Sequence, residues 1–122
     1  MKVLVIDDDS QIRLMLREVL VWAGYEVFEA ENGREGLFQQ RRHLADLVIT
    51  DLIMPEQEGL ETIAVLKKEF PKLKIIAVSG GGRVSPDMYL PTAQEFGADM
   101  VFSKPFDIRR LSEAVKQLLA AS

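Results

Sequence analysis

Two short apolar runs, at residues 3–6 and 47–50, each lead directly into acidic residues. Runs this short and this rich in β-branched side chains are typical of strands buried on both faces, which occur mainly in parallel sheets covered by helices. Asp7 and Asp8 follow the first run, and Asp51 follows the second. If both strands end at the same edge of one sheet, the three carboxylates meet there.

Converging carboxylates repel one another unless a cation neutralises them. A small, rigid set of oxygen ligands suits Mg²⁺. In open parallel sheets, ligands bind beyond the carboxyl ends of the strands, where the strand order reverses. The sequence therefore predicts a magnesium pocket made by Asp7, Asp8 and Asp51.

Strand-like and helix-like patterns alternate five times along the chain. The expected strands cover residues 3–6, 26–30, 46–51, 73–78 and 100–103, the fourth stopping at Ser79 and the three glycines that follow it. The expected helices lie between Ser10 and Gly24, from an Asn32 cap to about Arg42, between Gly59 and Pro71, at about 86–96, and from an Asp107 cap onward. Such alternation, with right-handed crossovers, predicts an α/β fold: a doubly wound parallel sheet with helices on both faces.

Composition narrows the function classes. A length of 122 residues suits one domain, and a net charge of −4 argues against a nucleic-acid partner. The densest basic cluster, Arg41, Arg42 and His43, is expected to be a solvated helix end.

The absence of cysteine excludes disulfides, thiolate metal sites and cysteine nucleophiles. No signal peptide and no apolar stretch of the ~20 residues needed to span a bilayer are present, so we expect a cytoplasmic protein without membrane contact.

The motifs at the expected strand ends resemble the receiver domain of two-component response regulators, the fold of the single-domain chemotaxis regulator. The resemblance covers residues 2–120 and rests on residues 5–13, 49–55 with Gly59, 78–79, 97–99 and 104–106. It implies a flavodoxin-like receiver fold with five strands in the order 2-1-3-4-5. It also implies a single receiver domain over residues 1–122.

The resemblance implies a role for each acidic residue. Asp51 would be the phosphoacceptor, its carboxylate attacking the phosphorus of a phosphohistidine. Asp8 would bind Mg²⁺ directly and Asp7 chiefly through water. The backbone carbonyl of Ile53 would complete the protein ligands.

Other residues around the pocket also receive roles from the resemblance. Lys104 would pair with Asp51 and grip one oxygen of the phosphoryl group, and Ser79 would donate its hydroxyl to another. Gly80 would leave room beside the phosphoryl group. Pro105 would follow a cis peptide bond that aims Lys104 into the site.

One position departs from the family pattern. Members of the family usually carry an aromatic residue or histidine three positions before the lysine, where this chain has Val101. Phe102 is expected on the opposite face of its strand, because side chains alternate. Switching is therefore expected to reorder the long loop after Ser79 and the helix at 86–96.

The resulting hypothesis is a phosphorylatable signalling switch that receives its phosphoryl group from a histidine kinase or a histidine phosphotransfer protein. It would act on a downstream protein through a contact surface, as a monomer or weak dimer, and would catalyse only its own phosphorylation and dephosphorylation. One alternative is a receiver domain excised from a larger response regulator or hybrid kinase. Another is a phosphorylation-independent interaction module. A third, an aspartate-nucleophile phosphatase, would require a cap insertion that is absent.

Overall fold

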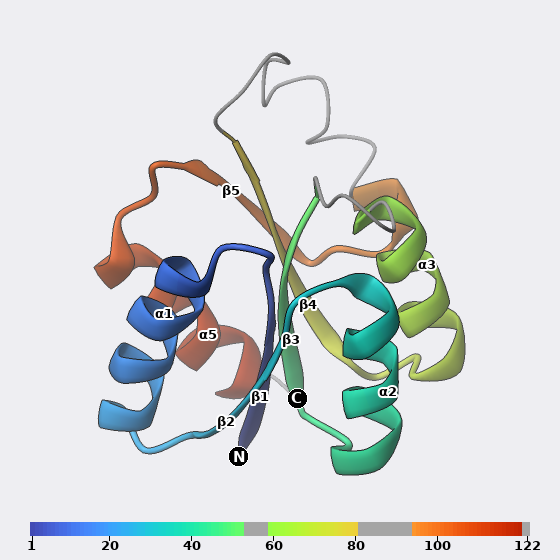
Figure 1. Ribbon diagram of the computed structural model, residues 1–122, viewed down its shortest axis with the longest axis horizontal. Coiled ribbons are helices and arrows are strands. Elements are labelled where there is room, and N and C mark those ends of the chain that lie inside the picture. The colour runs from blue at the N-terminus through green and yellow to red at the C-terminus, as the bar shows by residue number, and fades with distance from the viewer. Residues whose placement is uncertain (53–58, 81–93, 121–122) are drawn as a thin grey trace.

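The computed structural model describes residues 1–52, 59–80 and 94–120, which form a parallel five-stranded sheet flanked by helices (Figure 1). The strand order is β2-β1-β3-β4-β5, as predicted. The strands are β1 (Lys2–Ile6), β2 (Glu26–Ala30), β3 (Leu47–Asp51), β4 (Lys74–Gly80) and β5 (Met100–Lys104). The helices are α1 (Ser10–Trp22), α2 (Gly33–His43), α3 (Gly59–Glu69) and α5 (Ile108–Ala120).

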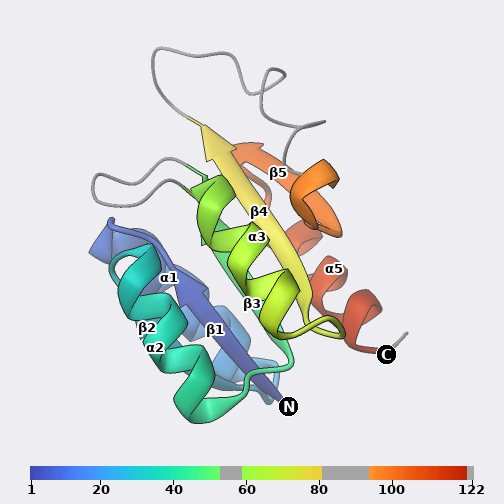
Figure 2. The same cartoon turned by 90° about the vertical axis from the view of Figure 1, so that its right-hand side faces the viewer.

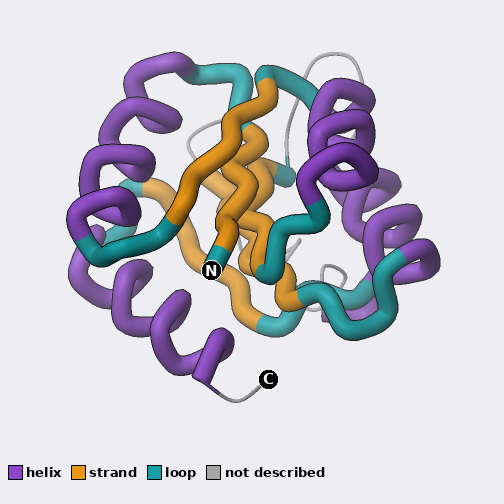
Figure 3. Tube along the Cα trace, turned by 90° about the horizontal axis from the view of Figure 1, so that it is seen from below, coloured by secondary structure: helices purple, strands orange, loops and turns teal. Residues whose placement is uncertain are grey.

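Two apolar clusters, one on each face of the sheet, hold the layers together. Helices α1 and α5 cover one face, and α2 and α3 lie side by side on the other (Figures 1 and 2). Viewed from below, the sheet runs between the two helical layers (Figure 3). This arrangement explains the continuous apolar runs. In β1, Val3 and Val5 enter one cluster while Leu4 and Ile6 enter the other, so neither face of the strand tolerates a polar residue.

Polar side chains cap the N-termini of three of the described helices. Oδ1 of Asp9 accepts a hydrogen bond from the Gln11 N–H at 2.9 Å, which caps α1. Asn32 caps α2 through the Glu35 N–H at 2.8 Å. Before α5, Oδ1 of Asp107 accepts from the Arg109 N–H at 2.9 Å. The caps predicted at Asn32 and Asp107 are confirmed.

The structure corrects one strand boundary. The prediction that the fourth strand stops at Ser79 is wrong, because β4 continues through Gly80. Ser79 pairs with Ser103 and Gly80 with Lys104, so the neighbouring strand β5 supplies the partners that extend it. Residues 94–96 are helical, and the rest of the helix expected at 86–96 lies outside the described residues.

The basic helix end is only partly solvated. The side chain of His43 is half-buried and stacks on Phe28, with ring centroids 3.9 Å apart and an angle of 15° between the rings. Arg41 is exposed and pairs with Glu69 of α3. His43 is therefore a packing residue rather than part of a free basic cluster.

Helix α1 exposes several apolar side chains to solvent. Leu14, Val21 and Trp22 are 55%, 50% and 91% exposed. Trp22 consequently contributes nothing to the core.

Among the described residues, no helix is both long enough and apolar enough to cross a bilayer.

Candidate functional site

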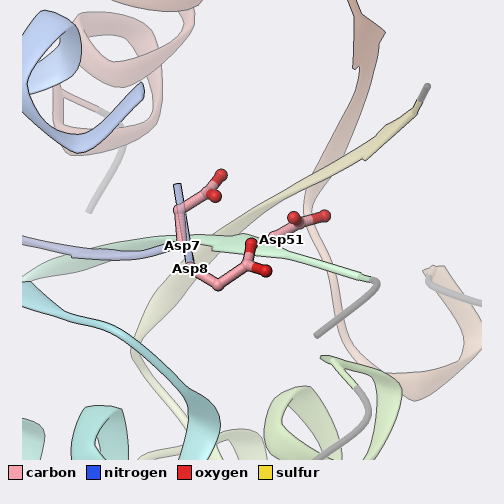
Figure 4. A group of neighbouring side chains, drawn as sticks. All are labelled: Asp7, Asp8 and Asp51. Atoms are coloured by element: carbon pink, nitrogen blue, oxygen red, sulfur yellow. The ribbon is translucent and has the colours of Figure 1, made fainter. Parts of the chain in front are cut away.

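Three acidic side chains meet at the carboxyl edge of the sheet. Strands β1 and β3 are hydrogen-bonded neighbours, with Ile6 opposite Thr50, so the residues that follow them come together. Figure 4 shows Asp7, Asp8 and Asp51 at these strand ends, and one carboxylate oxygen from each lies within 4.8 Å of the others. Asp7 and Asp51 are buried, whereas Asp8 is exposed. The predicted acidic pocket is confirmed in its geometry.

Lys104 joins this cluster from the end of β5. Its Nζ lies 3.0 Å from Oδ2 of Asp7 and 3.2 Å from Oδ2 of Asp51. The Lys104–Pro105 peptide bond is cis, as the family resemblance implied. One ammonium group thus bridges two buried carboxylates.

Hydrogen bonds hold Asp7 from several directions. Its N–H donates to the carbonyl oxygen of Ala30 at 3.1 Å, which ties it to β2. Its Oδ1 accepts from the Asp9 N–H at 2.9 Å, and its carbonyl oxygen accepts from Nη1 of Arg13 at 2.6 Å. With Lys104 on Oδ2, both carboxylate oxygens of Asp7 already accept a hydrogen bond.

Burial and pairing shift the ionisation of the site in identifiable directions. Burial raises the pKa of Asp7 above its ordinary 3.8, against the opposing effects of the Asp9 N–H and Lys104. Burial alone would lower the pKa of Lys104, but attraction to Asp51 and Asp7 outweighs it and raises that pKa above 10.5. Lys104 therefore stays cationic at neutral pH. Among the described residues, three carboxylates face one ammonium group, and this excess of negative charge favours binding of a cation.

Ser79, on β4 near the same edge, carries a buried hydroxyl group. Ser79 is 0% exposed, and its Oγ makes no hydrogen bond within the described part of the chain. A buried hydroxyl without a partner is unfavourable by roughly 1–3 kcal/mol. An oxygen-rich ligand at this edge would relieve that cost, so Ser79 suits the phosphoryl-binding role that the resemblance implied.

Two further predicted positions lie on β4 and β5. Gly80 ends β4, in register with Lys104. Val101 packs against the cluster on the α2 and α3 side, and Phe102 against the cluster on the α1 and α5 side. The predicted alternation of Val101 and Phe102 is confirmed. Ile53 falls outside the described residues.

Two supporting contacts had no strong signal in the sequence. Arg13 reaches back from α1 to the Asp7 carbonyl, and its Nε pairs with Glu29 at 3.2 Å. Gly59 begins α3 against the end of β3, where its N–H donates to the Leu52 carbonyl at 3.0 Å. A Cβ at position 59 would clash with the Asp51 carbonyl and the Leu52 Cα. The available clue was position: Arg13 and Gly59 both belong to the segments that carry the family resemblance.

Comparison with known proteins agrees with this geometry. Residues 3–116 match the model of the response regulator receiver domain. The chain belongs to this family. It is 35% identical over 118 residues to sporulation initiation phosphotransferase F of Bacillus subtilis, covering 97% of this chain and 93% of that protein. It is 36% identical over 118 residues to the chemotaxis protein CheY of Thermotoga maritima, covering 96% of each.

A solved structure shows the same fold. The response regulator receiver domain protein from Clostridium thermocellum superposes with a TM-score of 0.89 at 31% identity, covering 98% of this chain and 94% of that one. Receiver domains are the signalling switches of two-component systems, act through phosphorylation, and are not classical enzymes. The family interacts with histidine kinases or phosphotransfer proteins and generally uses Mg²⁺.

Proposed function

We propose that this receiver domain accepts a phosphoryl group on Asp51, from a histidine kinase or a histidine phosphotransfer protein. The observation that carries the proposal is the bridging position of Lys104, 3.2 Å from Asp51 and 3.0 Å from Asp7, beside the three clustered carboxylates. Pairing with an ammonium group favours the ionised form of a buried carboxylate, which is the form that attacks phosphorus. The same ammonium group can then bind an oxygen of the incoming phosphoryl group.

In the proposed reaction, a carboxylate oxygen of Asp51 forms a bond to phosphorus while the bond between phosphorus and the donor's histidine nitrogen breaks. The electron pair of that bond remains on the imidazole, which takes up a proton. Phosphoryl transfer needs little beyond in-line positioning and neutralisation of the phosphoryl oxygens. The Lys104 ammonium and a bound cation would supply the positive charge at this edge.

The acidic residues fit a magnesium ion. The donor set is made only of oxygen atoms, and its excess negative charge calls for a cation. Asp8 is the better direct ligand because its side chain is exposed, whereas both oxygens of Asp7 already accept hydrogen bonds, which favours contact through water. Asp51 would be a further ligand, and we assign the remaining protein ligand to the backbone carbonyl of Ile53, as the resemblance implied. When bound, Mg²⁺ would neutralise charge that develops on the phosphoryl oxygens.

Lys104 and Ser79 complete the proposed machinery. Lys104 would hold one phosphoryl oxygen. The Ser79 hydroxyl, which has no partner among the described residues, would donate to another. Gly80, next along β4, would leave space beside the group. Because Val101 replaces the usual aromatic residue, we propose that the signal passes through the segment after Gly80 to a surface that a downstream protein contacts.

Labelling with a small phosphodonor tests the assignment. The chain is incubated with acetyl phosphate and Mg²⁺, and incorporation is followed by intact-mass spectrometry. We expect one phosphoryl group per chain, lost in Asp51→Asn and when EDTA removes the metal. Asp46→Asn is the matched control, because the Asp46 carboxylate lies at the opposite edge of the sheet, where it accepts from the Lys2 N–H at 2.8 Å.

Other outcomes separate the alternatives. Unaltered labelling of Asp51→Asn would refute Asp51 as the phosphoacceptor. Absence of labelling in the unmodified chain with Mg²⁺ present would favour a phosphorylation-independent interaction module. Continuous hydrolysis of phosphate esters would favour an aspartate-nucleophile phosphatase. Labelling at Asp51 is expected both for a stand-alone receiver and for a receiver domain of a larger regulator.

A further inference from the structure

Arg13 links the acidic pocket to a neighbouring strand. It lies in the first turn of α1, and its side chain is only 14% exposed. Nη1 donates to the carbonyl oxygen of Asp7 at 2.6 Å, while Nε donates to Oε1 of Glu29 on β2 at 3.2 Å. One rigid guanidinium group therefore connects the end of β1 to β2.

The carbonyl that Arg13 binds has a special position. It belongs to the peptide unit between Asp7 and Asp8, two of the residues assigned to the cation. The orientation of that peptide unit decides where both carboxylates point. On the other side of Asp7, its N–H is held by Ala30 of β2 at 3.1 Å. The main chain of Asp7 is thus fixed at both ends.

We propose that Arg13, oriented by Glu29, is a positioning residue for the cation pocket. It sets the plane of the Asp7–Asp8 peptide, so that both carboxylates present their oxygen atoms to Mg²⁺ without reorganisation. This inference rests on the metal site of the proposed function. Arg13 acts through the backbone and is not assigned any contact with the phosphoryl group.

Two possible roles for Arg13 predict opposite effects of its removal on the affinity for Mg²⁺. If the guanidinium acted only as a nearby positive charge, it would repel Mg²⁺, and its removal would tighten binding. If it positions the ligands, its removal loosens the peptide unit and weakens binding. Supporting groups around a metal site typically change its affinity by about 10- to 100-fold.

Arg17 provides a matched control within the same cluster. Its Nη1 pairs with Oε2 of Glu29 at 2.9 Å, and its side chain is 48% exposed. Arg17 therefore pairs with the same carboxylate as Arg13, whereas the Asp7 carbonyl is held by Arg13. Arg17→Met removes the same charge from the same helix and the same partner.

The test is isothermal titration of the whole chain with Mg²⁺. We expect Arg13→Met to bind Mg²⁺ about 10-fold more weakly than the unmodified chain and Arg17→Met to stay within about twofold of it. Unchanged or tighter binding by Arg13→Met would overturn the proposal. Thermal unfolding in EDTA checks that each variant is folded. If Arg13→Met fails to fold, Glu29→Gln is titrated instead, with Glu31→Gln controlling for the lost charge, and equal affinities of these two would also overturn it.

Phosphorylation by acetyl phosphate gives a second, separable readout. At saturating Mg²⁺, Arg13→Met should be labelled at the rate of the unmodified chain, with only the Mg²⁺ concentration for half-maximal labelling increased. A reduced rate at saturation with unchanged Mg²⁺ affinity would contradict a positioning role. If the unmodified chain binds Mg²⁺ but is never labelled, the proposed function fails, while the titration still decides the role of Arg13.

Discussion

The ammonium nitrogen of Lys104 lies 3.2 Å from Oδ2 of Asp51, although the two residues are 53 positions apart in the chain. Removing that cation leaves two buried carboxylates facing each other. We expect Lys104→Met to lower the free energy of unfolding of the metal-free protein by about 2 kcal/mol, less than for a fully buried pair because the Lys104 side chain is 20% exposed. Urea denaturation in EDTA measures this.

Added Mg²⁺ should recover more stability in Lys104→Met than in the unmodified chain, because the ion replaces part of the lost positive charge. The control is Lys116→Met on α5, whose side chain is exposed. Its effect should stay within about 0.5 kcal/mol. Equal losses in the two variants would show that the bridge contributes nothing to stability.

Asp7→Asn should stabilise the metal-free protein at neutral pH, because burial penalises the charged carboxylate. Burial raises the pKa of Asp7 above 3.8, so the folded protein binds the proton more tightly than the unfolded chain does. Stability is therefore lost as the pH rises from 3.8 through the folded-state pKa, and the loss is complete above it. The advantage of the variant should vanish below pH 3.8. Urea denaturation across pH would reveal the opposite trend if the ion pair with Lys104 dominated.

Gly59→Ala should disturb the site as well as the fold. The added Cβ would meet the Asp51 carbonyl and the Leu52 Cα, so α3 and the end of β3 must move apart. We expect a loss of about 2–3 kcal/mol of stability, together with slower labelling by acetyl phosphate. Gly24→Ala is the control: no atom lies within 4 Å of its added Cβ, but φ is 99°. That variant should lose stability and keep its labelling rate.

Leu44→Gly should stabilise the protein. Leu44 ends α2 with φ 53° and ψ 58°, a left-handed conformation that favours glycine, and its side chain is 60% exposed. Relief of the backbone strain should outweigh the extra chain entropy, for a net gain of about 0.5–1 kcal/mol in thermal or urea unfolding. Leu14→Gly, 55% exposed within α1, should lose about 1 kcal/mol. A loss at both positions would contradict the strain argument.

The sequence predicted the sheet and its acidic edge well because both depend on local patterns. Residues 3–6 and 47–50 are apolar throughout, apart from Thr50, since each strand is buried on both faces. Parallel strands end at one edge, so acidic residues that follow such runs are expected to meet. The error at Ser79 has the same origin: glycines usually stop a strand, and only pairing with β5 shows that this one continues.

By itself, the sequence determined the alternation of strands and helices, the family, and the meeting of Asp7, Asp8 and Asp51, because spacing and burial pattern are properties of a single segment. Only the tertiary structure decided that Arg13 holds the Asp7 carbonyl, that Glu29 orients Arg13, and that Gly59 closes against β3. These contacts join separate segments through side-chain rotamers and strand register. Such geometry is set by packing of the whole domain and leaves no periodic trace in the chain.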